Sequence, residues 1–470
     1  MAYGRAVAWL LSWSVFAAND WPRFRGPNGT GVSGARNLPV KFDANSNLAW
    51  KAPAPSGISS PVVAGDRVIV AGYEAQRRLV VCFDLKTGKR LWLQSLEAQR
   101  SERRTPPNDP APSTPATDGH SVYAYFPDYG LVAYTLQGKE RWRTPLGPFN
   151  PPHGMSSSPI LAGDSVILAA DQVTDSFVAA FDSANGRLRW RTARPSLVGG
   201  YSTPVVCRDE LIVSGPLQLT AYSPSTGERL WSAPNMGALP ISVPVCDGDT
   251  LYVNNAAVPP FESMAVGLKA DRNGDGKLSP EEFPDPAFKE AVLAIDRAYG
   301  NGDGAIDARE WDGALKLMQT LNALAALRIR DGQAEERWRT SRNLPDVPSP
   351  VLYLNVLYLV KDGGILTSLD PATGQVHKQG RLAGAVDKYF ASPVAADGKL
   401  FALSESGKVA VVKAAPQWEL LAVNDLGEEC YATPAIVEGG ILIRTKHALY
   451  CFRAASRLPV KRQVHRQQPL

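Results

Sequence analysis

The chain has 470 residues, of which 44% are hydrophobic and 20% charged, and it is rich in Gly (40) and Pro (38). Abundant turn formers with few helical patterns favour an all-β fold. Five cations lie near the two ends, and without those five the net charge of the remaining body falls from +4 to −1: Arg5, Arg457, Lys461, Arg462 and Arg466. A near-neutral body excludes the broad basic surface that binds nucleic acid.

The first residues have the layout of a secretory signal peptide. One cation precedes the apolar run Ala6–Phe16, and the small residues Ala17 and Ala18 follow it. We therefore predict a signal peptide over 1–17, an N-terminal segment over 18–48, and a periplasmic or extracellular mature protein. The apolar run is shorter than a membrane span of about 18 residues, and no cysteine at the cleavage point supports a lipid anchor.

The basic residues 456–470 are interpreted as a solvated, disordered tail, with contact to an anionic lipid or polymer as the alternative. The five cysteines are odd in number and scattered along the chain, so they imply no disulfide framework. Cys82 and Cys451 occupy similar places in two strand-like segments, which is typical of buried packing.

A short unit recurs along the chain from residue 59 onward. Each copy opens on a small residue, then Ser, Thr or Val, then Pro, then an apolar strand, as in SSPVVAGDRVIV. The eight prolines that mark the copies are Pro61, Pro115, Pro159, Pro204, Pro244, Pro350, Pro393 and Pro434. Their spacings are 54, 44, 45, 40, 106, 43 and 41 residues, so all but one lie near a single period. Such a period is the signature of a repeat architecture.

The second half of each unit predicts further strands. The segment LVVCFDLKTGKRLW alternates apolar residues, turns at a Thr-Gly pair and places Trp92 four residues after the glycine. Three other units put Trp142, Trp190 and Trp231 at the matching position. Each period thus holds about four short strands, the content of a propeller blade. Blades bury both faces only by stacking, and a tryptophan plate suits the space between neighbours.

The ends of the repeat array predict ring closure. The last unit stops at ALYCF, one strand short of a blade, and the segment NLAWKAP, with Trp50, fits the missing outer strand. The sequence therefore predicts an all-β fold, an eight-bladed β-propeller over 49–455, closed by N- and C-terminal strands that share a blade.

Together these units resemble the pyrroloquinoline-quinone-type (PQQ-like) β-propeller repeats over residues 20–453. The resemblance is carried by the opening DWPRFRGPNGTGVS, the corners TGKRLW and TGERLW, and the closing segments ASPVAADGKLFALSESGKVAVVK and NDLGEECYATPAIVEGGILIR. Blade six departs from the pattern, because Lys378 stands where tryptophan is expected. Blade five is interrupted by an insertion over 256–320.

This insertion contains helical patterns and the loop ADRNGDGKLSPEEF, which matches an EF-hand calcium loop with Gly276 at its sharp turn. Its expected calcium ligands are Asp271, Asn273, Asp275, Lys277, Ser279 and Glu282. A polar turn without metal is the alternative. Extracellular sites of this type bind calcium at ~10⁻⁴–10⁻³ M, so we expect a permanently filled, structural site rather than a sensor.

A second loop, IDRAYGNGDGAIDAREW, fits the template less well. The weaker ligands that an alignment on Gly304 offers are Asn301, Asp303, Ala305, Asp307 and Glu310. Position 1 then falls on Tyr299, and Asp296 replaces it only if the loop carries three extra residues. We expect this loop to bind calcium weakly or through altered geometry, or to pair with the first loop without metal. Apolar stripes indicate short packed helices on both sides: Phe288, Val292, Ile295, Trp311, Leu315 and Met318.

Two functions fit this architecture. The resemblance implies a PQQ-dependent quinoprotein dehydrogenase that oxidises alcohols or sugars. In such an enzyme, PQQ lies on the axis with an axial Ca²⁺, a carboxylate base, a stacking tryptophan and a disulfide between adjacent cysteines. The chain has no adjacent cysteines, no carboxylate stands out as the base, and the EF-hand calcium is a different ion.

We therefore favour a non-catalytic platform for a protein, peptide or glycan, similar to the propeller lipoproteins that assist outer-membrane assembly. No catalytic residue is assigned, because the five histidines are dispersed and no nucleophile elbow or phosphate loop is present. His153 either faces the axial channel or is a loop histidine bonded to backbone. Arg100, Arg103 and Arg104 form either a binding lip or a solvated loop. We expect a monomer with no nucleic-acid partner and no membrane span.

Overall fold

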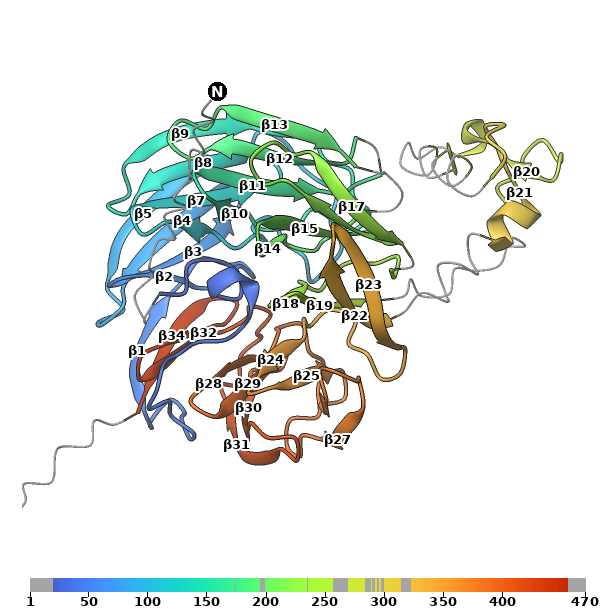
Figure 1. The fold of residues 1–470 in the computed structure, drawn as a ribbon. Helices are drawn as coiled ribbons and strands as arrows, with labels where there is room; N and C mark the ends of the chain where they lie inside the picture. The colour runs from blue at the N-terminus through green and yellow to red at the C-terminus, as the bar shows by residue number, and fades with distance from the viewer. Residues whose placement is uncertain are drawn as a thin grey trace, which may run out of the picture.

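The structure is a computed structural model. The residues that it describes are 20–173, 175–194, 199–234, 236–256, 269–283, 289, 292–293, 296, 300–313 and 323–454. The expected signal peptide, 1–17, and basic tail, 456–470, lie outside these residues. In the described part of the chain the strands form eight four-stranded sheets and one two-stranded sheet. Figure 1 shows the eight sheets arranged radially as a propeller, with the two-stranded sheet to one side.

The first four blades follow one another in chain order, and their strands pair antiparallel in that order. Blade one contains β2 (Val62–Ala64), β3 (Arg67–Glu74), β4 (Arg77–Asp84) and β5 (Arg90–Glu97). Blade two contains β6 (Ala116–Thr117), β7 (Ser121–Phe126), β8 (Gly130–Thr135) and β9 (Glu140–Pro145). Blade three contains β10 (Ile160–Ala162), β11 (Ser165–Ala170), β12 (Phe177–Asp182) and β13 (Leu188–Ala193). Blade four contains β14 (Val205–Cys207), β15 (Glu210–Gly215), β16 (Gln218–Tyr222) and β17 (Arg229–Pro234).

The other four blades complete the ring. Blade five contains β18 (Val245–Asp247), β19 (Thr250–Asn255), β22 (Ala323–Arg330) and β23 (Gln333–Thr340). Blade six contains β24 (Val351–Tyr353), β25 (Val356–Lys361), β26 (Ile365–Leu369) and β27 (Val376–Arg381). Blade seven contains β28 (Val394–Ala396), β29 (Lys399–Leu403), β30 (Lys408–Lys413) and β31 (Glu419–Asp425). Blade eight contains β32 (Ala435–Val437), β33 (Gly440–Arg444), β34 (Ala448–Arg453) and, from the other end of the repeat array, β1 (Leu48–Pro53).

The eighth blade confirms the predicted closure. Strand β1 pairs antiparallel with β34, and Trp50 lies opposite Cys451 in the register. Because one blade is built from both ends of the array, the ring cannot open without breaking a four-stranded sheet. The prediction of an all-β, eight-bladed propeller is therefore confirmed.

Tryptophans join the blades as the sequence predicts. Trp50 donates its Nε1–H to the Leu85 carbonyl of the next blade at 3.0 Å, and its ring lies against Gly88. A Cβ on Gly88 would lie 2.6 Å from that ring, so only glycine fits the corner. The same contact recurs in four further pairs: Trp92–Gly138, Trp142–Gly186, Trp190–Gly227 and Trp338–Gly374. The corner glycine and the tryptophan therefore form the two sides of one contact between blades.

A ring of hydrogen bonds runs around the inner ends of the blades. In seven of the eight blades, the residue before the marker proline donates its backbone N–H to the hydroxyl of its counterpart in the next blade, at 2.9–3.0 Å. The donor–acceptor pairs are Ser60–Thr114, Thr114–Ser158, Ser158–Thr203, Val243–Ser349, Ser349–Ser392, Ser392–Thr433 and Thr433–Ser60. The link from Thr203 is missing because Val243 has no hydroxyl to accept it.

The junction between blades four and five departs from the others in three ways. It lacks the ring bond to Val243, and Trp231 bonds Glu210 of its own blade at 2.9 Å. A disulfide, Cys207–Cys246, connects the innermost strands β14 and β18 instead. The cysteine pattern alone did not predict this disulfide, since the two residues stand three and two positions after their marker prolines. Cys82, Cys430 and Cys451 are buried free thiols.

The N-terminal segment crosses one end of the central channel. It forms isolated bridges at Trp21 with Val63 in blade one and at Val32 with Ala395 in blade seven. Between them lies the short 3₁₀ helix η1 (Pro27–Gly29). We call this end the plug face, and it carries the turns between the first and second strands of each blade. The opposite end, the loop face, carries the blade-to-blade connections and the connections between second and third strands.

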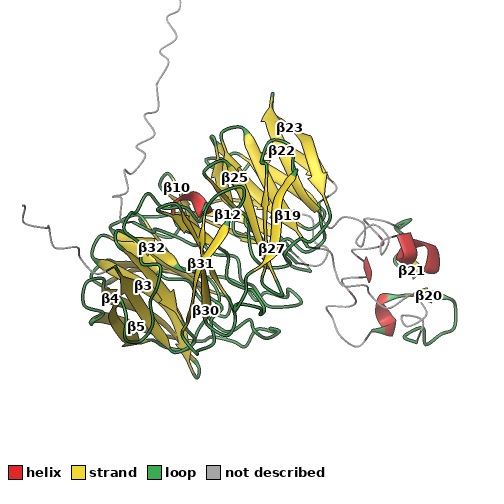
Figure 2. Ribbon diagram, turned by 90° about the horizontal axis from the view of Figure 1, so that it is seen from below, coloured by secondary structure: helices red, strands yellow, loops and turns green. Residues whose placement is uncertain are grey.

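The insertion belongs to the loop face, because it connects β19 with β22, the second and third strands of blade five. It contains β20 (Lys277–Leu278), the 3₁₀ helix η2 (Pro280–Glu282), β21 (Ile306–Asp307) and a helical stretch over 308–313. Figures 1 and 2 both place β20 and β21 to one side of the propeller. In the described part of the chain, no helix is long and apolar enough to cross a membrane.

Candidate functional site

The first loop of the insertion, Asp271–Glu282, is folded around its two terminal carboxylates. Asp271 accepts the N–H groups of Gly274 at 2.7 Å and Gly276 at 2.9 Å. Glu282 accepts the N–H groups of Arg272 at 2.8 Å and Ser279 at 2.7 Å. The bond from the Ser279 N–H holds the pKa of Glu282 below its usual value, so this carboxylate is ionised at neutral pH. The loop therefore presents negative charge from both of its ends.

The second loop repeats this arrangement with Asp296 as its first residue. Asp296 accepts the N–H groups of Gly302 and Gly304, both at 2.8 Å. Glu310 closes the loop by accepting from Asn301 at 2.9 Å and Asp307 at 3.0 Å. Asp296 thus makes the contacts that the first residue of the loop makes, although the alignment on Gly304 puts Tyr299 at that position. The second loop therefore carries three extra residues. Tyr299 lies outside the described residues.

The two loops are paired through a short two-stranded sheet. Lys277 lies opposite Asp307 and Leu278 opposite Ile306, with both apolar side chains fully buried. The Lys277 Nζ also lies 2.5 Å from an oxygen of Asp303 in the other loop. Backbone pairing between loops is the arrangement that an EF-hand pair requires, because it couples the geometry of one loop to that of the other.

The loops contain more kinds of oxygen than carboxylates alone. In the described part of the chain, no three His, Cys, Asp or Glu side chains are grouped so as to hold a metal. Three of the six expected ligands of the first loop are an asparagine, a serine and a backbone carbonyl.

Val292 and Ile306 belong to a small buried apolar cluster, with Phe283 and Trp311 packed against it. The remaining stripe residues lie outside the described residues: Phe288, Ile295, Leu315 and Met318.

The arginine-rich loop before blade two is tied down on the loop face. Arg100 donates to the Pro127 carbonyl at 2.6 Å and to Glu102 at 2.5 Å. Glu102 in turn accepts the Phe149 N–H. These contacts make Arg100 a half-buried anchor between blades rather than part of a solvated loop.

His153 lies beside the arginine-rich loop. Its Nδ1 lies 3.2 Å from the Thr105 hydroxyl, and its ring packs 5.9 Å from the Tyr201 ring. Burial and the neighbouring Arg103 lower the pKa of His153, which favours the neutral imidazole. These contacts place His153 in the loop packing, where it orders the connection before blade three.

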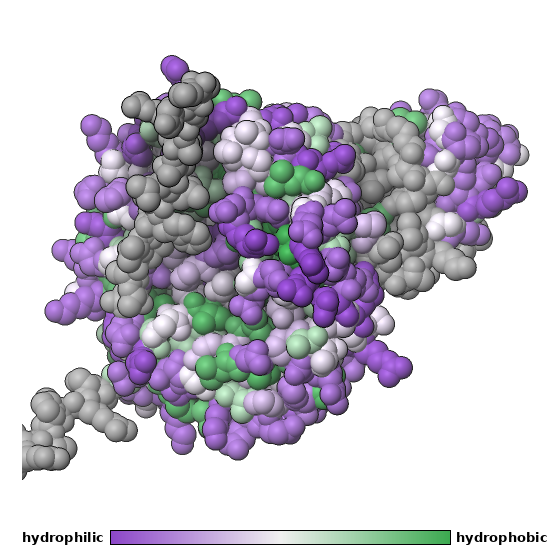
Figure 3. All heavy atoms as spheres, viewed as in Figure 1, coloured by the Kyte–Doolittle hydropathy of each residue, from purple (hydrophilic) through white to green (hydrophobic). Residues whose placement is uncertain are grey.

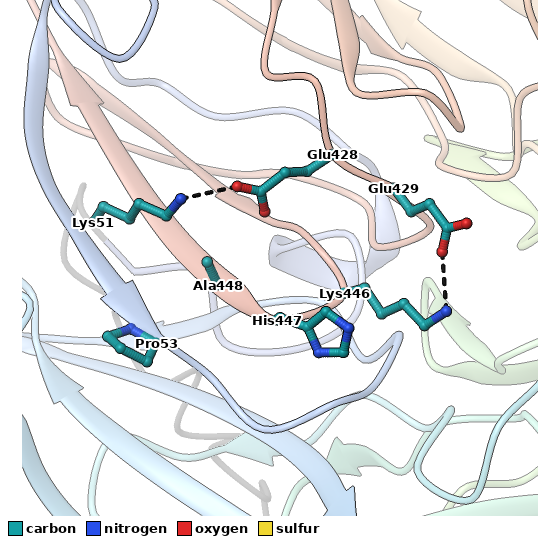
Figure 4. Close-up of a pocket in the computed structure, with 7 residues that line it drawn as sticks. All are labelled: Lys51, Pro53, Glu428, Glu429, Lys446, His447 and Ala448. Carbon is teal, nitrogen blue, oxygen red and sulfur yellow. Dashed lines mark hydrogen bonds and ion pairs between the residues drawn. The ribbon is translucent and has the colours of Figure 1, made fainter.

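A surface hollow of about 700 Å³ lies on the loop face where β1 closes the ring (Figure 4). Glu428 accepts hydrogen bonds from Lys51 at 2.9 Å, Thr445 at 2.6 Å and Tyr450 at 2.5 Å. A second ion pair, Lys446–Glu429, lies beside it at 3.0 Å. Because the two lysines and two glutamates pair with one another, a ligand in the hollow would meet polar groups whose charges are already balanced.

Two features that the resemblance implies for a quinone site are lacking among the described residues. The seven tryptophans of the described blades stand on or beside outermost strands, the part of each sheet farthest from the axis: Trp50, Trp92, Trp142, Trp190, Trp231, Trp338 and Trp418. Trp21 lies under Gly26, whose Cβ would sit 2.5 Å from its ring. The disulfide joins cysteines 39 residues apart rather than neighbours. In the described part of the chain, neither the stacking indole nor the adjacent-cysteine disulfide is present.

The sequence reasoning missed two features of this site. It offered Asp296 as the first residue of the second loop only if three extra residues intervene and did not include it among the expected ligands, whereas the structure bonds Asp296 as it bonds Asp271. It also gave no role to the opening DWPRFRGPNGTGVS beyond family resemblance, although this segment closes one end of the channel. Its alternation of arginine and glycine was the available signal, since glycines allow backbone to pass close to large side chains.

Eight four-stranded blades, Trp–Gly joints and strands shared between the ends define a PQQ-like β-propeller. The chain belongs to the family described as outer membrane protein assembly factor BamB, whose model matches residues 28–172, 76–256 and 312–463. A second model, described as EF hand, matches residues 268–283.

Individual proteins are similar to the chain in sequence or in fold. The outer membrane protein assembly factor BamB of Bordetella pertussis is 25% identical over 190 residues, which span 39% of this chain and 44% of that protein. BamB from Moraxella catarrhalis has a TM-score of 0.54 at 11% identity, covering 86% of this chain and 98% of that one. Quinohemoprotein alcohol dehydrogenase from Comamonas testosteroni has a TM-score of 0.58 at 12% identity, covering 94% and 82%. At these identities the solved structures show a shared fold alone.

Proposed function

We propose that the protein is a calcium-binding, non-catalytic platform of the cell envelope that holds a protein partner on its loop face. The observation that carries this proposal is the placement of the insertion. It leaves the propeller between β19 and β22, on the face that also carries the blade-to-blade connections, while the N-terminal segment covers the opposite end of the channel. The loop face thus carries the insertion, while the N-terminal segment covers the channel at the plug face.

The chemistry of the loop face supports a macromolecular partner. The hollow beside β1 is broad and open, and its charges are paired within the protein. Propellers display loops from a rigid ring, so a partner meets a preformed surface. The family description, an assembly factor, supports a protein partner over a glycan. A periplasmic location agrees with the family description and with the expected signal peptide.

Site-specific photo-crosslinking tests which face binds. A photo-reactive residue at His447, exposed on the loop face, is expected to crosslink a protein of the envelope fraction. The same residue at Lys86, exposed in a plug-face turn of blade one, is the matched control and is expected to give no crosslink. Equal crosslinking from both positions would contradict a loop-face platform. Stoichiometric PQQ uptake with dye reduction on an alcohol or sugar would replace it with a dehydrogenase.

Calcium titration tests the insertion separately. Calorimetry on the purified protein is expected to give two calcium ions per chain, and Asp271→Ala and Asp296→Ala each to give one, because each removes the first carboxylate of a loop. Asp66→Ala, in an exposed turn of blade one, is the control and keeps both. Melting that is independent of EGTA, or an Asp271→Ala protein that binds like the unchanged protein, would refute the calcium proposal.

A further inference from the structure

Two arginines of the N-terminal segment are buried at the centre of the ring. The Arg23 Nη2 donates to the Pro204 carbonyl of blade four at 2.6 Å, and the Arg25 Nη2 donates to the Pro350 carbonyl of blade six at 2.6 Å. Arg23 is 6% exposed and Arg25 is 0% exposed. Since these carbonyls belong to marker prolines beside the innermost strands, both guanidinium groups lie near the axis of the ring.

Neither arginine has a carboxylate partner in the described part of the chain, where no Asp or Glu oxygen lies within 4.0 Å of either one. The Nε of Arg23 and the Nε and Nη1 of Arg25 are buried without a hydrogen-bond partner. Two other buried arginines of the propeller are paired, Arg78 with Asp128 at 2.5 Å and Arg194 with Asp171 at 2.6 Å. The fold therefore supplies counter-charges elsewhere and omits them here.

A third buried arginine, Arg444, has several backbone acceptors for its two Nη atoms, while its Nε is buried without a hydrogen-bond partner. The Arg444 Nη1 and Nη2 donate to backbone oxygens of Ser59 at 2.8 Å, Ala71 at 2.5 Å and Pro55 at 3.0 Å. Burial lowers the pKa of Arg444 to about 10, and the nearby carboxylate of Asp109 partly offsets this effect. Arg23 and Arg25 have neither this set of oxygens nor a nearby carboxylate.

Both guanidinium groups remain charged at neutral pH. Burial lowers the pKa of Arg23 to about 9, and burial together with the charge of Arg23 lowers that of Arg25 to about 9. The two cations therefore repel each other in a poorly solvated place. A buried charge without a partner costs several kcal/mol, and proteins normally offset that cost with an opposite charge.

We propose that the free donor atoms of Arg23 and Arg25 bind one small oxyanion, such as inorganic phosphate, sulfate or a carboxylate, on the propeller axis. A guanidinium offers N–H donors in a planar fork that matches the oxygens of such anions. Gly29 and Gly31 line the same place, and a Cβ on them would lie 3.3 Å from the Arg23 Nη2 and 2.9 Å from the Arg25 Nη2. The site is thus tight. It does not depend on the proposed platform function.

Anion binding is measured on the full purified protein after dialysis into chloride. Calorimetric titration with inorganic phosphate is expected to show one site per chain, and Arg25→Gln to weaken it at least 10-fold. Arg36→Gln, an exposed arginine of the same segment, is the matched control and keeps the affinity. A parallel titration with acetate distinguishes a carboxylate from a tetrahedral oxyanion. Absence of saturable binding to any of these anions, or unchanged binding by Arg25→Gln, would overturn the proposal.

A crystallographic measurement covers the case in which Arg25→Gln fails to fold. Crystals of the unchanged protein soaked in selenate, an anomalously scattering analogue of sulfate, are expected to show a selenium peak within hydrogen-bond distance of Arg23 and Arg25. Selenium peaks confined to exposed lysines and arginines would overturn the proposal without any variant.

Discussion

Arg78 and Asp128 form an ion pair that joins blade one to blade two. The Arg78 Nε lies 3.0 Å from both carboxylate oxygens of Asp128, and the two side chains are 3% and 1% exposed. Asp128→Ala is expected to destabilise the protein by about 3–5 kcal/mol, because it leaves a guanidinium buried without its counter-charge. Urea unfolding measures this loss.

The neighbouring pair Arg77–Glu74 is the matched control. Its Arg77 Nη2 lies 2.8 Å from a Glu74 oxygen, but the side chains are 51% and 65% exposed. Glu74→Ala is expected to cost less than about 1 kcal/mol, since solvent screens an exposed pair. If Asp128→Ala costs no more than Glu74→Ala, burial does not set the strength of these pairs.

Glu428 gives the seam of the ring a dependence on pH. Burial raises its pKa, but hydrogen bonds from Thr445, Tyr450 and Lys51 outweigh burial, and the net pKa lies below its usual value. The unfolded chain therefore takes up a proton before the folded one does as the pH falls. The stability that Glu428 contributes is present above the ordinary glutamate pKa and is lost as the pH falls through the lower folded value.

Glu428→Gln tests this dependence through the melting temperature between pH 3 and pH 7. The variant is expected to melt lower than the unchanged protein at pH 7 and to approach it at the acid end, because both then carry an uncharged group. A constant difference across the whole range would show that the lost contacts matter rather than the charge.

Among the structural elements, the joints between blades are the part that sequence predicts best. The corner glycine and the tryptophan recur at fixed offsets, so their pairing follows from local pattern and from the need to bury both faces of a blade. The EF-hand match is also local, because it falls within residues 268–283, and calcium binding there stays a prediction.

Long-range contacts are where sequence reasoning fails. Arg23 reaches Pro204, 181 residues away, and no spacing rule predicts which blade an extended segment crosses. The disulfide is similar, because Cys207 and Cys246 occupy different offsets from their prolines. The first residue of the second loop stayed conditional for a different reason, since three extra residues shift Asp296 beyond the template. The contact of Arg23 with Pro204 and the disulfide depend on the closed ring, which exists only once all eight blades are in place.

The disulfide stabilises the junction that lacks the other two joints. Between blades four and five the hydroxyl ring is broken at Val243, and Trp231 is turned to its own blade. A disulfide across 39 residues restrains the unfolded chain, and its removal by Cys207→Ser with Cys246→Ser is expected to cost about 2–4 kcal/mol. Denaturant unfolding with and without reductant measures this loss.

Val243→Thr is the complementary variant. A threonine there offers the missing acceptor to the Thr203 N–H, so in the disulfide-free protein it is expected to restore about 0.5–1.5 kcal/mol. Reductant must leave the stability of the double serine variant unchanged, which separates the disulfide from the three buried thiols. If the double variant is as stable as the unchanged protein, the remaining packing of β14 against β18 already closes the junction.

At the scale of the whole molecule, the propeller and the insertion meet at one hairpin. Asn255 at the end of β19 lies opposite Ala323 at the start of β22, so blade five is already in register where the insertion leaves it. Replacing 256–322 by Asn-Gly would close a two-residue hairpin between the same strands. The excised chain is expected to fold, to melt within a few degrees of the unchanged protein, and to lose any response to EGTA.

The propeller and the insertion share a small apolar contact. The buried cluster of the insertion includes the propeller residue Ala238, and the propeller residues Leu217 and Leu239 are partly buried against it, so excision exposes these three side chains. Shortening the connection also lowers the entropic cost of pairing β19 with β22. Circular dichroism and melting of the excised chain, with calcium and with EGTA, check both points. Failure of that chain to fold would show that the calcium loops are part of the blade rather than an attachment to it.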